Sequence, residues 1–329
     1  MKKFLVVVFS LFMLVGCGKN DENVVKEFEK KVNSLDNYHL IGEMEIVNNE
    51  DKYNYTVDVT FKKGNYYKVS LTNKENNHEQ IILKNDEGVY VVTPSINKSF
   101  KFQSEWPTNS SQSYVLETVL KDVLKDQDRS VGSTGSKYTI KSKVNYPNNG
   151  DLKTQEITLG KDYLPNKVVV KNSSNIEVIK TVITKIDTKT KYDKEYFMLN
   201  NNIKESVENT DKEASNTLES VVYPMYLPSG TKYSGEEVIT NEDKERVILT
   251  YTGVKPFILI EEAQKRNDVH ETTLVSGDVV QYGNVLGILT NTSLNWSSGG
   301  KEYYIIGESL TSDELLKIAS STATVALSK

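Results

Sequence analysis

The sequence holds very few of the residues on which disulfides and metal sites depend. Its 329 residues include one cysteine, Cys17, and only three histidines. A single cysteine excludes an internal disulfide, so the stability of the chain must come from its hydrophobic core. His39, His78 and His270 have no second His or Cys at ligand spacing. The sequence therefore predicts no metal site, and nothing in it indicates a bound cofactor.

Positive charge and catalytic motifs are scarce as well. The chain has 40 Lys and Arg against 45 Asp and Glu, a net charge of −5. This balance argues against a nucleic-acid partner and against broad electrostatic adhesion to anionic lipid. The sequence lacks a nucleophile elbow, a Walker loop and a dinucleotide-binding glycine pattern. We expect acidic pairs such as Glu236-Glu237 and Glu261-Glu262 to be solvated surface, and the protein not to be an enzyme.

The start of the chain is its most specific segment. After two lysines, Phe4–Val15 form an apolar run, which is shorter than the ~20 residues needed to span a bilayer. The run ends in Leu14-Val15-Gly16-Cys17, which resembles a bacterial lipobox. We expect residues 1–16 to be a signal peptide and Cys17 to be the lipidated N-terminus, with palmitate-like acyl chains. The protein would then be anchored on the outer face of a bacterial cytoplasmic membrane; an ordinary signal peptide beside a stray cysteine is the alternative.

The periodicity of the sequence predicts helices and strands in a regular order. Residues 17–23 are expected to be a lipidated tether, followed by an amphipathic helix with apolar residues at helical spacing from Val24 to Leu35. From Tyr38 onward the apolar residues alternate, as in antiparallel strands joined by tight turns. A second helical stripe covers 115–124, and further strands follow. The sequence thus predicts an α+β domain over 24–199, in which one curved antiparallel sheet covers two helices.

A second, smaller domain is expected near the C-terminus. Residues 200–220 have almost no apolar side chains and are predicted to be a linker. Residues 221–329 are predicted to form a small α+β domain, with five or six antiparallel strands and one helix. Thr311 and Glu314 match a capping box at the start of that helix, and Leu310 and Leu315 match a hydrophobic staple.

Several stretches resemble a known family. "QIILKNDEGVYVVTPSINKSFKF" and the "SEWP" that follows resemble the LolA-like lipoproteins of Gram-positive spore formers, which include germination-specific and sporulation lipoproteins. "YLPSG" and "LNWSSGGKEYYIIGESLTSDELLKIASS" resemble the small C-terminal domain of DUF4367-type proteins. The resemblance implies a half-barrel sheet curled over helices, with an apolar concavity that holds acyl chains in the carriers. Its possible lining here is Phe102, Trp106, Leu116 and Leu120.

The resemblance leaves two classes of function open. In the first, the anchored protein binds an envelope or spore-cortex protein or peptide, and regulates or activates cortex or envelope machinery in sporulation or germination. In the second, the concavity holds a lipid or another acyl ligand. An anchor at Cys17 argues against a soluble shuttle. A large apolar cavity would favour a lipid, whereas a filled core would favour a protein partner.

Overall fold

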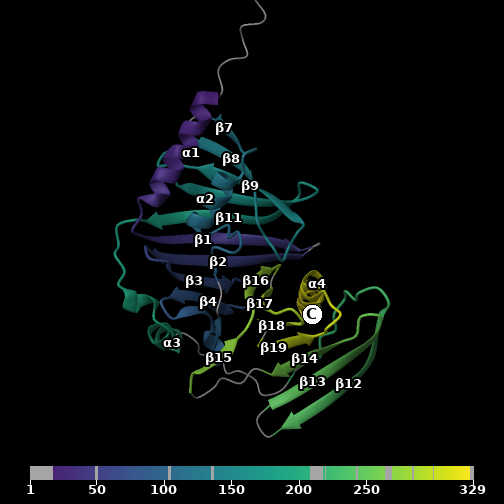
Figure 1. Ribbon diagram of the computed structural model, residues 1–329. Helices are drawn as coiled ribbons and strands as arrows, with labels where there is room; N and C mark the ends of the chain where they lie inside the picture. The colour runs from purple at the N-terminus through teal and green to yellow at the C-terminus, as the bar shows by residue number, and fades with distance from the viewer. Residues whose placement is uncertain are drawn as a thin grey trace, which may run out of the picture.

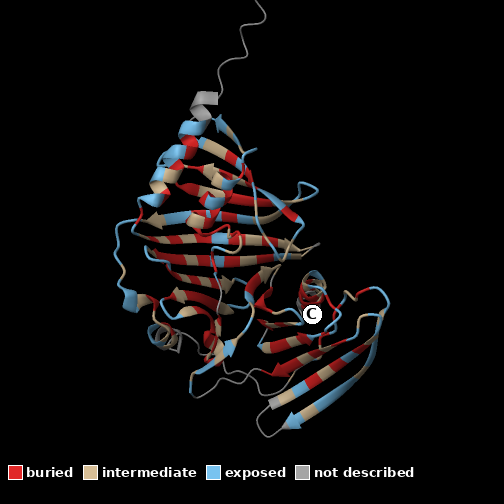
Figure 2. Ribbon diagram, viewed as in Figure 1, coloured by how far each residue is buried: buried red, intermediate tan, exposed pale blue. Residues whose placement is uncertain are grey.

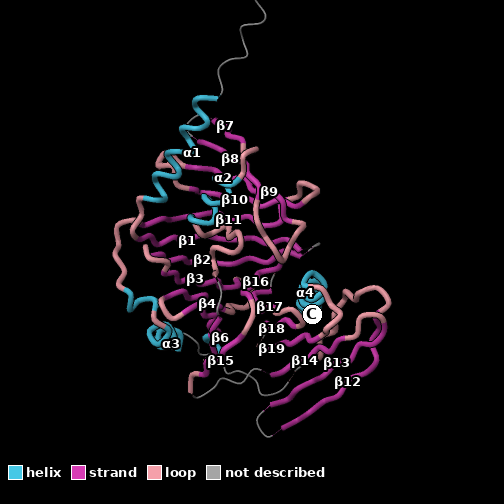
Figure 3. Tube along the Cα trace, viewed as in Figure 1, coloured by secondary structure: helices cyan, strands magenta, loops and turns pink. Residues whose placement is uncertain are grey.

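The computed structural model describes residues 18–48, 51–102, 105–134, 137–207, 218, 220–241, 244–263, 269–283, 285–298 and 300–326. The predicted signal peptide and Cys17 lie outside these residues. The molecule is mostly β, with two sheets and a few helices (Figures 1 and 3). This agrees in outline with the predicted antiparallel sheets packed on helices. None of the described helices is long and apolar enough to cross a membrane.

The larger sheet has twelve strands, in the order β15-β6-β5-β4-β3-β2-β1-β11-β10-β9-β8-β7. All neighbours are antiparallel except β15 and β6, which run parallel. Its strands are β1 (Asn37–Asn48), β2 (Asp51–Lys62), β3 (Tyr66–Asn73), β4 (Glu79–Asn85), β5 (Gly88–Thr93), β6 (Lys98–Phe102), β7 (Ser130–Thr134), β8 (Lys137–Lys143), β9 (Leu152–Leu159), β10 (Pro165–Asn172), β11 (Glu177–Asp187) and β15 (Glu271–Val275).

Two helices pack on one face of this sheet, as the sequence predicts. They are α1 (Gly18–Asn33) and α2 (Leu116–Lys125), and their apolar stripes join the alternate strand residues in one hydrophobic core. Helix α1 starts at Gly18, so residues 18–23, which the sequence predicts to be part of a tether, are helical. An i,i+4 ion pair between Glu22 and Lys26 supports this first part of the helix.

The opposite face of the sheet is covered locally by short helices. They are η2 (Pro94–Ile96), η3 (Lys194–Phe197) and α3 (Leu199–Val207). Leu199 packs on a cluster of Ile81, Leu83, Tyr90 and Val92. Buried Asn202 donates from Nδ2 to two backbone carbonyl oxygens at 2.9 Å. The first residues of the predicted linker, 200–207, are therefore helical, because side-chain packing and hydrogen bonds compensate for their polar composition.

The smaller sheet has seven antiparallel strands, more than the five or six expected. Their order is β12-β13-β14-β19-β18-β17-β16, and their bounds are β12 (Thr231–Asn241), β13 (Lys244–Gly253), β14 (Phe257–Ala263), β16 (Asp278–Tyr282), β17 (Val285–Leu289), β18 (Ser293–Ser298) and β19 (Lys301–Ile306). The polar run 231–241 forms an additional, largely exposed strand (Figure 2). The run 278–289 folds into the hairpin β16–β17, with Gly283 at a φ of +58°.

Helix α4 (Ser312–Ala326) covers one face of the smaller sheet. Its predicted cap is confirmed: the Thr311 amide donates to Glu314 Oε2 at 2.9 Å, and the Glu314 amide donates to Thr311 Oγ1 at 3.3 Å. Leu310 and Leu315 are both buried in the same core. Reciprocal capping and apolar contact together fix where this helix begins.

The C-terminal part of the chain contributes one strand to the larger sheet, which the predicted domain organisation does not include. After β14 the chain leaves the smaller sheet, adds β15 to the edge of the larger sheet, and returns at β16. Figure 1 shows β15 beside the end of the larger sheet, with the smaller sheet next to it. Residues 221–329 therefore contribute to both sheets.

Candidate functional site

The four residues expected to line a ligand concavity come together in the core of the larger sheet. Phe102 ends β6, Trp106 lies in the loop that follows, and Leu116 and Leu120 are on α2. Each is between 1 and 4 % exposed. The Trp106 ring contacts the Tyr67 ring edge-on, with 5.9 Å between centroids. The structure thus brings the predicted residues together as packed core side chains.

A hairpin from the smaller sheet closes the remaining side of this core. Val279, Leu286 and Ile288 of β16–β17 belong to the core of the larger sheet. Gln80 on β4 donates from Nε2 to the Leu286 carbonyl at 3.4 Å. Val280, next to Val279 on β16, belongs to the core beneath α4 instead. One hairpin therefore belongs to both hydrophobic cores and occupies the mouth of the concave face.

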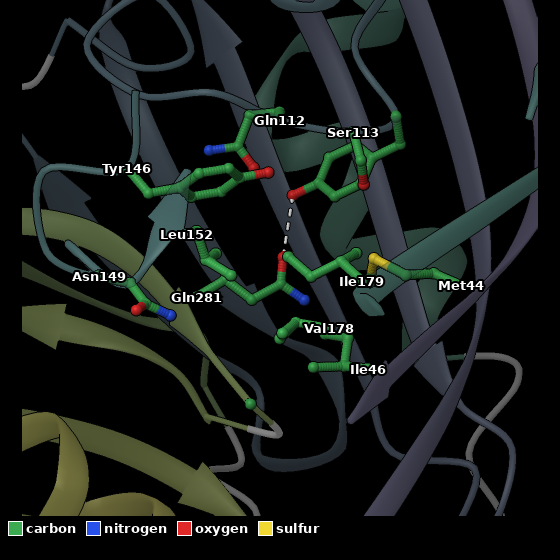
Figure 4. A pocket seen from close by; sticks show the side chains of 12 residues that line it. Met44, Ile46, Gln112, Ser113, Tyr146, Asn149, Leu152, Val178, Ile179 and Gln281 are labelled. Atoms are coloured by element: carbon green, nitrogen blue, oxygen red, sulfur yellow. Dashed lines mark hydrogen bonds between the residues drawn. The ribbon is translucent and has the colours of Figure 1, made fainter. Parts of the chain in front are cut away.

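A small cavity is left between this hairpin, the sheet and the loop before α2 (Figure 4). Its apolar lining is Met44, Ile46, Leu152, Val178 and Ile179, and its polar lining is Gln112, Ser113, Tyr114, Tyr146, Asn149 and Gln281. Tyr114 donates from its hydroxyl to Gln281 Oε1 at 3.3 Å. The cavity measures about 20 Å³, which is room for about one water molecule. It offers neither carboxylates for acid–base chemistry nor space for an acyl chain.

A buried ion pair connects the two sheets. Lys98 on β6 places its Nζ 3.0 and 3.2 Å from the two carboxylate oxygens of Glu302 on β19. The Lys98 side chain is 13 % exposed and that of Glu302 is 4 % exposed. Glu302 lies directly opposite Glu262 in the register of β14 and β19. Lys98 therefore compensates negative charge that is concentrated inside the contact between the sheets.

The histidines stand apart from one another. His270, just before β15, lies 2.9 Å by Nε2 from Ser99 Oγ and 3.1 Å by Nδ1 from Asn97 Oδ1. His39 pairs with Asp58 on the neighbouring strand, and burial lowers the pKa of His78 to about 4. Within the described part of the chain, no group of three or more His, Cys, Asp and Glu residues could hold a metal ion.

Comparison with known proteins relates the chain to a sporulation protein. No family model matches it. Over 318 residues it is 34 % identical to "Sporulation protein YdcC" of Bacillus subtilis (strain 168), covering 95 % of this chain and 94 % of the relative. The chain belongs to the YdcC family. The resemblance to sporulation proteins that the sequence suggested is thereby confirmed.

Solved structures similar to this YdcC-family chain share little sequence with it. A chain of the Pseudomonas aeruginosa MucA/MucB complex is 10 % identical, with a TM-score of 0.34, covering 90 % of this chain and 97 % of its own length. The LolA superfamily protein NE2245 of Nitrosomonas europaea is 9 % identical, with a TM-score of 0.33 and coverages of 55 and 98 %. A chain of the Clostridioides difficile CwlD amidase–GerS lipoprotein complex is 16 % identical, with a TM-score of 0.21 and coverages of 54 and 96 %.

One acidic pair of this YdcC-family chain is buried, against the expectation that it would be solvated. Glu261 is 0 % and Glu262 7 % exposed. Glu261 accepts a hydrogen bond from the Val222 amide at 2.8 Å and pairs with Lys301 at 3.3 Å, and burial raises its pKa. Glu262 accepts from Arg246 Nη2 at 2.7 Å. Both carboxylates are occupied in structural ion pairs, because their cations are on neighbouring strands.

Glu117 is a half-buried carboxylate that has no marker in the sequence. Glu117 opens α2 and faces β1, where Tyr38 donates from its hydroxyl to Glu117 Oε2 at 2.9 Å. Burial raises the pKa of Glu117 to about 7. Burial and the nearby carboxylate raise the pKa of Tyr38 as well. The pair ties the first turn of α2 to the sheet and makes that attachment sensitive to protonation.

Sequence reasoning on this YdcC-family member also missed the hairpin and β15. A signal for the hairpin was present, because Gly283 interrupts two apolar runs in "GDVVQYGNVLGILT". For β15 the only local signal is the β-prone "TTLV", which does not indicate its partner strand.

Proposed function

We propose that this YdcC-family protein is a lipid-anchored protein of the outer face of the bacterial cytoplasmic membrane that binds a protein or peptide partner in sporulation or germination. By binding, it regulates or activates envelope or spore-cortex machinery, and it does not itself catalyse a reaction. The relationship to a sporulation protein supports the biological setting. The lipobox that ends at Cys17 supports the anchor.

The filled concavity is the observation that carries the choice of a protein partner. Sites for small molecules typically enclose ~300–1,000 Å³, whereas the cavity beside the β16–β17 hairpin measures about 20 Å³ and two others among the described residues measure about 30 and 130 Å³. Val279, Leu286 and Ile288 belong to the same packed core as the four residues predicted to line the concavity. These small volumes support recognition through the outer surface of the molecule.

The position of the chain start supports a surface that faces away from the membrane. Helix α1 begins one residue after Cys17 and contacts β7, at one end of the larger sheet. The smaller sheet lies toward the other end, where β15 joins β6 (Figure 1). An anchor at Cys17 would leave that far end accessible to an envelope partner.

Two measurements test the proposal. The mature chain without acyl groups is titrated against a fluorescent palmitate analogue, and we expect no saturable binding. In sporulating cells, the full-length anchored protein carries a photo-crosslinking residue at exposed positions on several faces, and we expect a specific protein adduct from at least one. Saturable acyl binding with no adduct from any face would support the lipid-binding alternative instead.

A further inference from the structure

Strand β15 ends the larger sheet, and no described strand pairs with its outer edge, which we call the open edge. It is the terminal strand in the sheet order, and the Glu271 amide donates inward to the Asn97 carbonyl at 3.2 Å. In a parallel ladder alternate residues turn their backbone groups to the same side. Glu271, Thr273 and Val275 therefore face β6, and the N–H and C=O groups of Thr272 and Leu274 point to the open edge.

Beyond Glu271, this edge lacks the charges, prolines and bulges that usually prevent strand addition. After Glu271 the strand reads Thr-Thr-Leu-Val, without charge, proline or glycine, and Leu274 is 70 % exposed. By contrast, the edge strand β12 carries Lys232 and Glu236, and its pairing is irregular between Tyr233 and Gly235. Charges and bulges of that kind protect exposed edges in natural sheets. Residues 272–275 of β15 have neither such a charge nor such a bulge.

Hydrogen bonds from the neighbouring strand β6 also hold β15 in place. Ser99 Oγ on β6 lies 3.0 Å from Thr272 Oγ1 and 2.9 Å from His270 Nε2. The neighbouring residue of Ser99, Lys98, forms the buried pair with Glu302. Because this edge is ordered before binding, the free energy of binding does not have to include the entropic cost of ordering it.

The location of β15 favours a partner remote from the membrane. The opposite edge of the larger sheet, β7, lies beside α1, contains Gly132 and has no exposed large apolar side chain. Eleven spacings of ~4.8 Å separate the two edges, roughly 50 Å along the curved sheet. Of the two edges, β15 is the one that an anchor at Cys17 would turn away from the membrane.

We infer that β15 binds an extended segment of a partner protein, which adds to the larger sheet as a further strand. The inference rests on the proposed protein-binding function and specifies its surface. An open ladder edge is complementary to extended backbone, and apolar residues at alternate positions of the segment would cover Leu274. A second copy of the chain fits less well, since pairing of two five-residue strands buries far less than the ~1,200 Å² of a stable dimer.

A defined peptide tests the edge. The probe is a fluorescent, acetylated peptide of alternating threonine and valine with flanking lysines, titrated into the full mature chain and followed by anisotropy. Leu274→Pro removes an N–H that points to the open edge and keeps the groups that face β6. We expect it to weaken peptide binding about tenfold, as the loss of one or two hydrogen bonds implies. Leu274→Thr keeps the N–H and is the matched control, which should bind nearly as well as the wild type.

A second variant and a hydrogen-exchange measurement test whether β15 stays in the sheet. Leu274→Lys places a charge at the edge and should also weaken peptide binding. Hydrogen exchange of the Thr273 amide, which faces β6, should be unchanged in all three variants if β15 stays in place. Equal binding by the proline and threonine variants, or no binding to the wild type, would overturn the inference. Concentration-dependent dimerisation abolished by Leu274→Pro would also overturn it, in favour of a second copy as the occupant.

Photo-crosslinking in cells distinguishes failure of this inference from failure of the proposed function. A photo-crosslinking residue at Leu274 should form a protein adduct in sporulating cells, and the adduct should be lost when Thr272→Pro is added. The control position is Ile176, which is 58 % exposed at the turn before β11. Adducts from Ile176 or other faces but none from Leu274 would overturn the edge inference and leave the protein-binding function intact.

Discussion

Lys98 and Glu302 face each other across the contact of the two sheets, with Lys98 Nζ 3.0 Å from Glu302 Oε1 and both side chains largely buried. A buried charge that loses its partner is strongly destabilising, while a matched apolar replacement of both is nearly neutral. Because Glu262 is the cross-strand neighbour of Glu302, loss of Lys98 also leaves two carboxylates close together.

Lys98→Ala should therefore lower the free energy of unfolding by about 3–5 kcal/mol in urea denaturation. Lys98→Met combined with Glu302→Met should recover most of that loss. The control is Lys63→Ala at the exposed pair with Asp36, which should cost less than about 1 kcal/mol. Equal effects at both sites would mean that the Lys98–Glu302 pair is solvated.

Leu120→Ala tests whether the concave face is packed. Leu120 is 4 % exposed in the core. Its truncation should therefore lower the free energy of unfolding by about 2–5 kcal/mol. Ile176→Ala, at 58 % exposure, should change stability by about 0.5 kcal/mol or less. Unfolding is followed by fluorescence, with a parallel titration of an acyl probe. Unchanged stability together with weaker probe binding would indicate a ligand cavity at Leu120 instead.

Glu117 should make stability depend on pH in a defined direction. Burial raises its folded-state pKa to about 7, from an ordinary value of 4.5, so the folded chain holds this proton more tightly than the unfolded chain does. The stabilising contribution is complete below about pH 4.5 and is lost as pH rises through about 7. This pKa shift corresponds to a change of about 3 kcal/mol in the free energy of unfolding between low and high pH.

Glu117→Gln is the variant that isolates this effect. Urea denaturation of wild type and variant between about pH 5 and pH 9 should show the stability of the wild type falling relative to the variant, with the difference levelling off above about pH 8. Glu22→Gln, at the exposed pair with Lys26, should leave the pH profile unchanged. A parallel pair of profiles for wild type and Glu117→Gln would show that Glu117 titrates normally.

Cleavage between the predicted domains should not separate them. A specific protease site introduced within residues 208–217 should yield two fragments that still elute together on gel filtration. They should stay associated because β15 pairs with β6 and the β16–β17 hairpin belongs to the larger core. The same cleavage with Leu286→Asp and Ile288→Asp should release the fragments. Separate elution of the unaltered fragments would restore the picture of two independent domains.

The predicted anchor has its own test. Cys17→Ala should abolish incorporation of a clickable fatty acid in growing cells, because the cysteine thiol is the acceptor of the lipid. Cys17→Ser, which keeps the size of the side chain, should do the same. Equal labelling of the variants and the wild type would exclude Cys17 as the lipidated residue.

Local structure was largely predictable from the sequence. Alternation around Tyr55 and Val57 identified β2, and the Thr311–Glu314 box identified the start of α4, because both signals depend on neighbours a few residues away. The burial of Glu262 was not predictable, since Arg246 reaches it only when β13 and β14 pair. The helical start of the expected linker depended likewise on the packing of Leu199 against distant strands.

The candidate site was predicted in part, for the same reason. Helical spacing placed Leu116 and Leu120 beneath the sheet, where the structure has them. That the β16–β17 hairpin would occupy the mouth of the concave face depends on contacts more than two hundred residues apart, such as Gln80 with Leu286. No local pattern encodes which surface such a hairpin meets.

The route of the chain through both sheets sets an order in which it can fold. A chain that is made from its N-terminus presents α1, α2 and β1–β11 well before residues 271–288 appear. Until then the part of the apolar face that the β16–β17 hairpin covers is exposed, and β6 is an edge strand without β15, which are conditions under which partly folded chains aggregate. Residues 271–288 therefore complete the larger sheet and its core late in synthesis, and a chain shortened before them would leave both surfaces exposed.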